Sequence, residues 1–246
     1  MDLSNRVAVI TGGRRIGAVV AAELARHGAD IALCYNRSRA EADQTAESVK
    51  ALGRRVFLKQ VNLTEARGCE SFMNESAAAL GRLDILVNMA SVYVNHPFDA
   101  ITVDDFDAGL AVDLRAAFAC ARAAVPHLRQ AGGGHIINFS DWLSRSGRPR
   151  YTGYLPYYVA KTAVIGLTEA LALELGPDRI RVNAIAPGPI LAPPETTDDE
   201  LAAVEKSTPL GQWGGEMAIA EAVLAILSCS FITGETVRVD GGRHVR

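Results

Sequence analysis

The chain has 246 residues, and 49% of them are hydrophobic, which is enough to bury a large core within one domain. Its formal net charge of -3 is too small to indicate a nucleic acid or an anionic membrane surface as the main partner. We therefore expect a single domain over residues 1–246 that binds a small molecule.

The cysteines and histidines do not show the spacing of a metal site. The four cysteines lie far apart in mostly apolar segments, as is typical of free thiols in a reducing compartment. The sequence begins without a basic and then apolar leader, and no apolar run reaches about 18 residues. These features predict a cytoplasmic protein with no bound metal and no membrane segment.

Short β-branched runs alternate along the chain with longer segments of helical periodicity. The runs predict strands at residues 6–11, 30–35, 55–60, 84–88, 135–140, 180–185 and 236–240. The longer segments predict helices near residues 15–27, 39–51, 65–80, 103–130, 156–175 and 216–228. Five glycines are expected to end helices in the left-handed conformation, namely Gly28, Gly53, Gly81, Gly132 and Gly176. This pattern predicts an α/β Rossmann fold, a doubly wound parallel sheet of about seven strands with helices on both faces.

Parallel sheets of this kind bind ligands beyond the carboxyl ends of their strands. Six predicted strands are followed there by polar, small or turn-forming residues, at Thr11/Gly12, Asn36/Arg37, Asn62, Asn88/Ala90, Asp141 and Pro187/Gly188. We therefore expect six loops to meet at one crevice.

The first predicted strand and helix are joined by the glycine-bearing turn TGGRRIG at residues 11–17. Such a turn frees backbone N–H groups and a helix N-terminus to hold a pyrophosphate. Arg15 is placed for a charge-assisted contact with phosphate, and a solvated helix charge is the alternative. After the second strand, Arg37 and Ser38 suit a 2'-phosphate, which favours NADPH over NADH. Alternatively, Arg37 and Arg39 are only charges of a first helical turn.

The segment YYVAK places Tyr157 and Lys161 four residues apart, on one face of a predicted helix. To exchange protons near neutral pH, the tyrosine pKa must fall from about 10 towards 7, a change of about 4 kcal/mol. A neighbouring ammonium would lower the tyrosine pKa in this way. Tyr158 could also contact Lys161, and so short a motif occurs by chance.

Several segments, in order along the whole chain, resemble the short-chain dehydrogenase/reductase family: TGGRRIG, NMAS at 88–91, YYVAK, APGPI at 186–190 and ITGETVRVDGG at 232–242. Within that family, RRIG, NRS after strand two, NMASVY at 88–93, FSD at 139–141 and the terminal DGGRHVR resemble the pteridine reductases, including the bacterial dihydromonapterin reductases. The resemblance implies that Tyr157 and Lys161 are catalytic and contact the cofactor. The other expected cofactor-binding residues are Gly12, Arg15, Ile16, Gly17, Asn36, Arg37, Ser38, Asn62, Leu63, Asn88, Ala90, Ser91, Pro187, Gly188 and Ile190.

Most of the family has a hydroxyl side chain at the position of Asp141. The pteridine reductases, like this sequence, have an aspartate there. The alternation of strand faces turns its neighbour Ser140 away from the crevice. An ionised carboxylate would oppose the negative charge that forms on oxygen during ketone reduction. It could instead bind a pterin and relay a proton through Tyr157 to a C=N bond, which makes Asp141 a third expected catalytic residue. The alternative is that Asp141 caps a turn or pairs with Arg145, Arg148 or Arg150.

The pteridine reductase branch further implies that Tyr93 stacks on the substrate and that Arg15 reaches substrate as well as phosphate, whereas core or rim packing is the alternative for Tyr93. The acidic, proline-punctuated segment 189–215 is expected to be a substrate lid. The family also implies a homotetramer built through residues 103–130 and 156–175. The branch suggests that the tail, residues 243–246, approaches a neighbouring subunit's pocket.

Two positions depart from the family pattern. Gly12 and Gly17 are five residues apart rather than six, and Asp113 replaces the usual helix-kinking asparagine that holds a relay water. We predict an NADPH-dependent reductase of a pterin or a similar C=N heterocycle. The alternatives are an NAD(P)-dependent carbonyl or alcohol dehydrogenase, such as a 3-oxoacyl thioester reductase or a sugar dehydrogenase, and a non-catalytic nucleotide-sensing protein.

Overall fold

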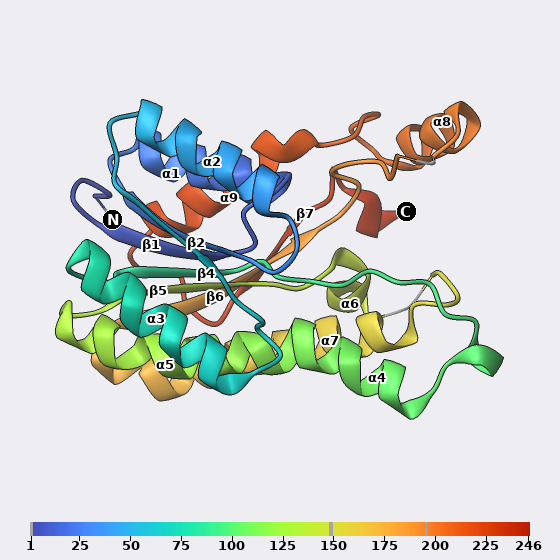
Figure 1. Cartoon of the computed structure of the whole chain (residues 1–246). Coiled ribbons are helices and arrows are strands. Elements are labelled where there is room, and N and C mark those ends of the chain that lie inside the picture. Colours follow the sequence, from blue (N-terminus) through green and yellow to red (C-terminus); the bar gives the residue numbers. More distant parts are fainter. Residues whose placement is uncertain (1, 148–149, 195) are drawn as a thin grey trace.

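A computed structural model describes residues 2–147, 150–194 and 196–246 of the chain. In the described part, seven strands form one parallel sheet in the order β3-β2-β1-β4-β5-β6-β7 (Figure 1). Their bounds are Val7–Thr11 (β1), Asp30–Tyr35 (β2), Val56–Gln60 (β3), Ile85–Asn88 (β4), Gly134–Phe139 (β5), Ile180–Pro187 (β6) and Thr236–Val239 (β7). The predicted doubly wound Rossmann fold is confirmed.

Helices cover both faces of the sheet and bury two separate cores (Figure 1). Alternate residues of β1 enter different cores, since Ala8 and Ile10 face one and Val7 and Val9 face the other. This explains why the strands read as continuous apolar runs, because every position is covered. One face carries α1 (Ile16–Arg26), α2 (Arg39–Ala51) and α9 (Gly215–Ser228); the other carries α3 (Ala66–Leu80), α5 (Ala116–Gln130) and α7 (Leu155–Leu175).

The long helix predicted over residues 103–130 is interrupted. It consists of α4 (Val103–Leu110), a π-helical turn (Ala111–Arg115) and α5. The π turn holds one residue more than an α-helical turn, so the backbone shifts by one position. Gly109, just before it, packs so closely on α7 that an added Cβ would lie 2.8 Å from the Cβ of Pro156.

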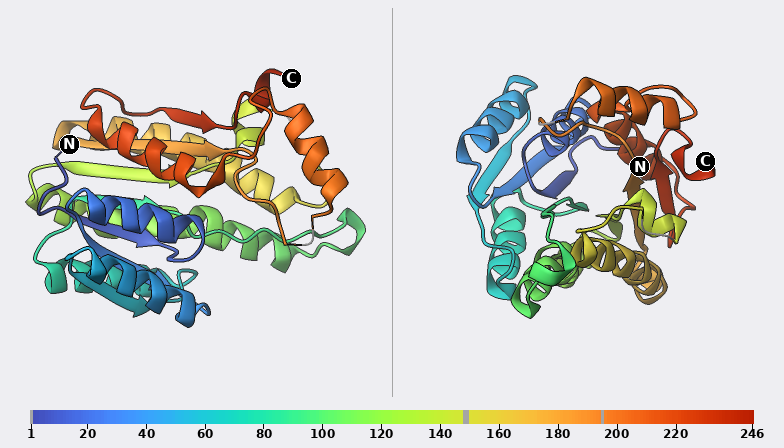
Figure 2. Two further views of the ribbon diagram at one scale, coloured as in Figure 1. Left: turned by 90° about the horizontal axis from the view of Figure 1, so that it is seen from above. Right: turned by 90° about the vertical axis from the view of Figure 1, so that its right-hand side faces the viewer.

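Two helices were not predicted, α6 (Trp142–Ser146) and α8 (Asp198–Ser207). The first is too short to show a periodicity, and the second has no buried residue and therefore no apolar stripe. Thr197 and Glu200 begin α8 with a capping box. Figure 2 shows α8 beyond the carboxyl ends of the strands, which are the ends marked by the arrowheads.

Four of the five helix-ending glycines have the predicted positive φ, between 74° and 98°. The prediction for Gly176 is wrong, because its φ is -54° and it begins a short 3-10 turn, Gly176–Asp178. Pro177 follows it and has no N–H to close the usual left-handed cap. The left-handed conformation is instead found three residues later, at Arg179, which has a φ of 59°. Arg179 donates its N–H to the Gly176 carbonyl at 2.9 Å.

Candidate active site

A cavity of about 1240 Å³ lies at the carboxyl ends of the strands. The predicted meeting of six loops is found there, since the segments after β1, β2, β3, β4, β5 and β6 all contribute to the lining. The cavity includes the point where β1 and β4 diverge to connections on opposite sides, which is where doubly wound sheets bind ligands. Its size exceeds that of a site for one drug-sized molecule.

Nearly all of the predicted site residues line this cavity: Gly12, Arg15, Ile16, Gly17, Asn36, Arg37, Ser38, Asn62, Leu63, Ala90, Ser91, Tyr93, Asp141, Tyr157, Lys161, Pro187, Gly188 and Ile190. Asn88 is the exception. Its side chain lies below the cavity floor and donates to Asn138 Oδ1 at 2.9 Å and to the Ala117 carbonyl at 3.3 Å. Because β4 turns this side chain towards α5, the side chain has a structural role, and a cofactor contact of Asn88 through its backbone stays a prediction.

The shortened glycine turn is tight. A Cβ on Gly17 would lie 2.0 Å from the Gly12 carbonyl oxygen, so no other residue fits there without moving the turn. Gly12 has a φ of 107°, and Arg15 takes a φ of 51°, a conformation that costs a non-glycine residue about 1 to 3 kcal/mol. No side chain of the described residues caps α1. The N–H groups of Gly17 and Ala18 donate to the carbonyls of Arg14 and Arg15, both at 3.0 Å, so a bound anion would use the N–H groups before them in the turn.

After the end of β2, Arg37 and Arg39 have different surroundings, which distinguishes the two roles that the sequence left open for them. Arg39 forms an ion pair with Asp43 on α2 at 3.4 Å, as expected for a solvated helix charge. Arg37 lines the cavity, is exposed, and has no ion pair among the described residues. Its guanidinium is therefore available to a ligand.

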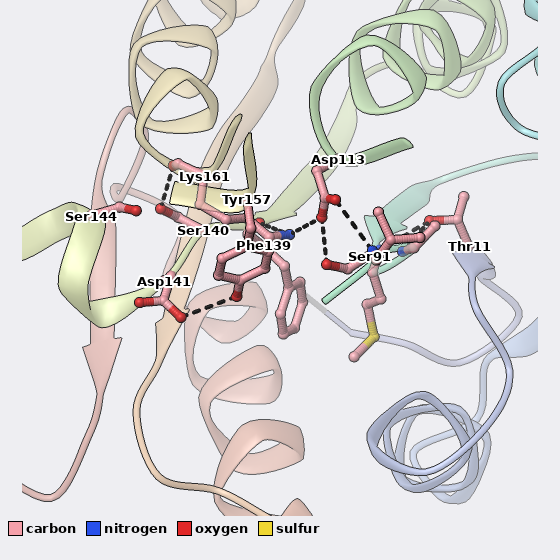
Figure 3. A network of polar contacts seen from close by, with 12 residues as sticks. Thr11, Ser91, Asp113, Phe139, Ser140, Asp141, Ser144, Tyr157 and Lys161 are labelled. Carbon is pink, nitrogen blue, oxygen red and sulfur yellow. Dashed lines mark hydrogen bonds and ion pairs between the residues drawn. The ribbon is translucent and has the colours of Figure 1, made fainter. Parts of the chain in front are cut away.

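The carboxyl group of Asp141 connects two parts of the site (Figure 3). Its Oδ2 accepts a hydrogen bond from the Tyr157 hydroxyl at 3.0 Å, and its Oδ1 accepts from the Leu143 N–H at 2.8 Å and so caps α6. Burial raises the pKa of Asp141, and these two donors and the Lys161 charge oppose the effect only in part. The side chain thus faces the cavity and caps a helix at once.

The arginines considered as partners of Asp141 are otherwise engaged. Arg145 pairs with Glu235 at 3.4 Å, and Arg150 donates to the main-chain oxygen of Arg246 at 2.6 Å. Arg148 lies outside the described residues. Ser140 points away from the cavity as expected, since its buried hydroxyl donates to the Lys161 carbonyl at 2.7 Å.

Lys161 is held by groups below the cavity floor. Its Nζ donates to the Phe139 carbonyl at 3.0 Å and forms an ion pair with Asp113 Oδ1 at 2.9 Å (Figure 3). Asp113 reaches this position from the π turn and also accepts hydrogen bonds from the Ser91 hydroxyl and from the Val92 N–H. Both side chains of the ion pair are buried, so removing either partner would leave an uncompensated buried charge at a high cost in stability.

The prediction that Lys161 lowers the pKa of Tyr157 is wrong for this arrangement. The pKa of Tyr157 lies well above its ordinary value, chiefly because the phenol is buried, and the charges of Asp141 and Asp113 raise it further. The Lys161 ammonium lies 5.5 Å from the ring centroid and is neutralised by Asp113. Tyr157 is therefore a neutral phenol that donates a hydrogen bond to Asp141.

Aromatic rings form one wall of the cavity. Tyr93 stacks on Tyr154 with 4.2 Å between ring centroids, and its edge meets the ring of Tyr157 at 4.8 Å. Tyr93 is 55% exposed, so it belongs to the cavity rim and not to the core. The phenol group is only partly buried, and this partial burial and the neighbouring Tyr154 raise its pKa, so the ring stays neutral. Such a wall suits a flat, uncharged ring system.

Several lining residues were not among the predicted site residues, namely Trp142, Arg150, Tyr151, Tyr154, Trp213 and Arg243. The segment SRSGRPRYTGYL at residues 144–155 supplies three of them, and its arginines and tyrosines were a sequence signal. Arg243, in the predicted tail, lines the cavity of its own chain. The approach of the tail to a neighbouring subunit stays a prediction.

Among the residues that the structure describes, no three His, Cys, Asp or Glu side chains come together as a metal site. Within the same part of the chain, no helix combines the length and the apolar character needed to cross a bilayer.

Comparisons with known proteins agree with this geometry. A family model of the short-chain dehydrogenases, described as enoyl-(acyl carrier protein) reductase, matches residues 11–244. The chain is 36% identical over 251 residues to a 3alpha-hydroxysteroid dehydrogenase of Mediterraneibacter gnavus, with 98% of each protein covered. It is 33% identical over 245 residues to the 3-oxoacyl-(acyl-carrier-protein) reductase FabG of Staphylococcus aureus, which covers 97% of this chain and 98% of that protein.

Among solved structures, a blue fluorescent protein from a metagenomic library, in complex with NADPH, matches with a TM-score of 0.89. It is 30% identical, and the match covers 99% of both chains. With the fold, the cavity and the residues placed as described, the chain belongs to the short-chain dehydrogenase/reductase family of oxidoreductases.

Proposed function

We propose that the protein is an NADPH-dependent reductase of a pterin or a similar flat heterocycle with a C=N bond. The observation that carries this proposal is the 3.0 Å hydrogen bond between the Tyr157 hydroxyl and Asp141, a carboxyl group whose pKa is raised by burial. When protonated, a carboxyl with a raised pKa is a proton source; when ionised, it opposes the negative oxygen formed in carbonyl reduction.

The residues present fit a bound NADPH. The tight turn at Gly12 and Gly17 and the uncapped start of α1 suit a pyrophosphate, and the unpaired guanidinium of Arg37 suits a 2'-phosphate. The cavity is large enough for a dinucleotide and a substrate together. When bound, the nicotinamide supplies the hydride.

The chain's own residues supply the proton and the orientation. Tyr157 donates its hydroxyl proton to the substrate nitrogen, and Asp141 passes its own proton to Tyr157 through their hydrogen bond. Lys161 is fixed by Asp113 and the Phe139 carbonyl, so its ammonium is positioned for the nicotinamide ribose. The exposed ring of Tyr93 supports the flat substrate from one side. One hydride and one proton together reduce the C=N bond.

The segment 189–215 is proposed to close over the substrate. It contains α8, which has no buried residue, yet Val204 on this helix and Trp213 after it line the cavity. Few buried contacts hold α8 to the body of the protein, as expected of an element that opens and closes.

A second candidate is a carbonyl or alcohol dehydrogenase. The names of the two relatives support it, because a hydroxysteroid dehydrogenase and a 3-oxoacyl thioester reductase both act at a carbon–oxygen bond. Asp141 argues against it, since an ionised carboxylate 3.0 Å from Tyr157 would oppose the charge formed on a carbonyl oxygen.

Steady-state NADPH oxidation distinguishes the two candidates. We expect turnover of 7,8-dihydrobiopterin and little turnover of an acetoacetyl thioester. Turnover of the thioester alone would refute the pterin proposal in favour of the second candidate. Tight NADPH binding with no turnover of either compound or of a broad carbonyl panel would refute both.

A further inference from the structure

Two guanidinium groups gather on one indole ring at the substrate end of the cavity. The Cζ atom of Arg150 lies 5.0 Å from the centroid of the Trp142 ring, and that of Arg243 lies 5.5 Å from it. The three residues come from different segments, namely the loop before α7, the chain end after β7, and α6. All three line the cavity, and Trp142 itself is buried.

Neither guanidinium pairs with an Asp or Glu side chain among the described residues. Arg150 donates to the main-chain oxygen of Arg246 at 2.6 Å. Arg243 donates to the Val204 carbonyl at 3.1 Å and to the Tyr151 hydroxyl at 3.3 Å. Arg246 is the last residue of the chain, so its main-chain oxygens carry a carboxylate charge that compensates Arg150. The acceptors of Arg243 are uncharged, satisfy only some of its five N–H donors and leave its charge uncompensated. Together the two guanidinium groups keep free donors and one uncompensated positive charge for a ligand.

The rest of the cavity makes these two charges stand out. The described cavity lining contains six cationic side chains (Arg14, Arg15, Arg37, Arg150, Lys161 and Arg243) against one carboxylate, Asp141. Lys161 is neutralised by Asp113, and the arginines of the glycine turn and of the β2 end lie where dinucleotide phosphates are proposed. The two arginines on Trp142 share only the main-chain carboxylate of Arg246, so one positive charge has no matching anion among the described residues at the proposed substrate end.

We propose that Arg150 and Arg243 form a subsite for an anionic group, a carboxylate or a phosphate, on the tail of the substrate. Trp142 follows Asp141 directly in the chain, so the subsite lies on the order of 10 Å from the reacting bond. Guanidinium groups hold such oxyanions through paired, charge-assisted hydrogen bonds. The inference rests on the proposed reductase function and deepens it. It applies whether the reacting bond is C=N or C=O.

Two matched substrate pairs test the subsite. Dihydrofolate carries glutamate carboxylates that 7,8-dihydrobiopterin lacks, and acetoacetyl-coenzyme A carries phosphates that acetoacetyl-N-acetylcysteamine lacks. For the pair that is turned over, kcat/KM for the anionic substrate is divided by kcat/KM for the neutral one. We expect Arg150→Ala and Arg243→Ala each to lower this ratio about tenfold or more. Arg150→Lys and Arg243→Lys keep the charge and should retain part of this preference. Lys50→Ala, which removes an exposed positive charge at the far end of α2, should leave the ratio unchanged.

An unchanged ratio in both alanine variants would overturn the subsite, even if the protein proves to be a pterin reductase. If neither pair is turned over, the proposed function fails and the subsite is tested by calorimetry. The NADP⁺-loaded protein is then titrated with p-aminobenzoylglutamate and with coenzyme A. Binding of either compound that is lost in the alanine variants but kept in Lys50→Ala supports the subsite; absence of binding, or equal binding in the variants, overturns it.

Discussion

The substitution Asp141→Asn removes the negative charge next to Tyr157 and leaves the local structure in place. The asparagine Oδ1 can still accept from the Leu143 N–H, so α6 keeps its N-cap, whereas Asp141→Ala would lose it at a cost of about 1 kcal/mol. The amide nitrogen takes the place of the oxygen that now accepts from the Tyr157 hydroxyl. The protein thereby loses its proton source without losing the loop.

The size of the effect follows from the distance between Asp141 and Tyr157. Two unit charges 3.0 Å apart interact by about 5 kcal/mol at an effective dielectric constant of about 20. This is an upper limit for the repulsion between an ionised Asp141 and a phenolate at Tyr157, and it corresponds to about 4 pKa units. Asparagine should therefore lower the pKa of Tyr157 by up to this amount, and it should relieve the same repulsion on a substrate oxygen.

We expect Asp141→Asn to lower kcat for dihydrobiopterin at least tenfold and to raise kcat/KM for an acetoacetyl thioester by a similar factor. Asp141→Ser, which restores a hydroxyl and can also cap α6, should move specificity in the same direction. Initial rates of NADPH oxidation from pH 5 to 9 measure both effects, and tyrosinate absorbance near 295 nm follows the phenol. Unchanged pterin turnover in the asparagine variant would show that Asp141 is not the proton source.

Four further outcomes are expected. Arg37→Ala should lower kcat/KM for NADPH about 10- to 100-fold and that for NADH only a few-fold; equal losses would contradict a 2'-phosphate contact. Gly17→Ala should abolish NADPH binding measured by fluorescence, because its Cβ would meet the Gly12 carbonyl. Burial lowers the pKa of His135 from 6.5 to about 3, so stability is full above pH 6.5 and falls as the pH drops towards 3. At pH 4, wild type should therefore lose about 3 kcal/mol of unfolding free energy that His135→Gln keeps, as urea titrations would show. Light scattering should give a homotetramer, associated through the exposed faces of α4, α5 and α7; a monomer would refute it.

The stability effect of Asp141 has the opposite sign to that of His135. Because burial raises the pKa of Asp141, the folded protein favours the protonated carboxyl. The stabilising contribution of this carboxyl to the folded state is fully present below its ordinary pKa of about 4. This contribution is lost as the pH rises through the raised pKa. Asp141→Asn should thus increase the melting temperature at pH 7 and leave it unchanged near pH 4. A lower melting temperature at pH 7 would contradict the burial of this charge.

The features that could be predicted from the sequence depend on local pattern. A strand covered on both sides must be apolar throughout, which is why the core strands could be located from composition alone. Tyr157 and Lys161 share a helix face by spacing, and the glycine turn follows from its place between strand and helix. The convergence of the loops follows from parallel topology.

The features that could not be predicted depend on how distant segments pack. Lys161 was expected to act on Tyr157, but Asp113 on a different helix binds its ammonium instead. Tyr154 stacks on Tyr93 only because the loop before α7 folds back over the end of β4. Arg243 reaches the cavity because the chain end returns to it. No periodicity or motif contains these three contacts, since each joins residues far apart in the chain.

The π turn at Ala111–Arg115 makes the length of this helical segment critical. One residue of an α-helix corresponds to a rotation of about 100°. Deleting a single residue here would restore regular winding but would swing α4 around its axis relative to α5. Gly109 would then leave its contact with Pro156, and the Asp113 carboxylate that anchors Lys161 would turn away. A deletion that conserves every proposed functional side chain would thus inactivate the protein.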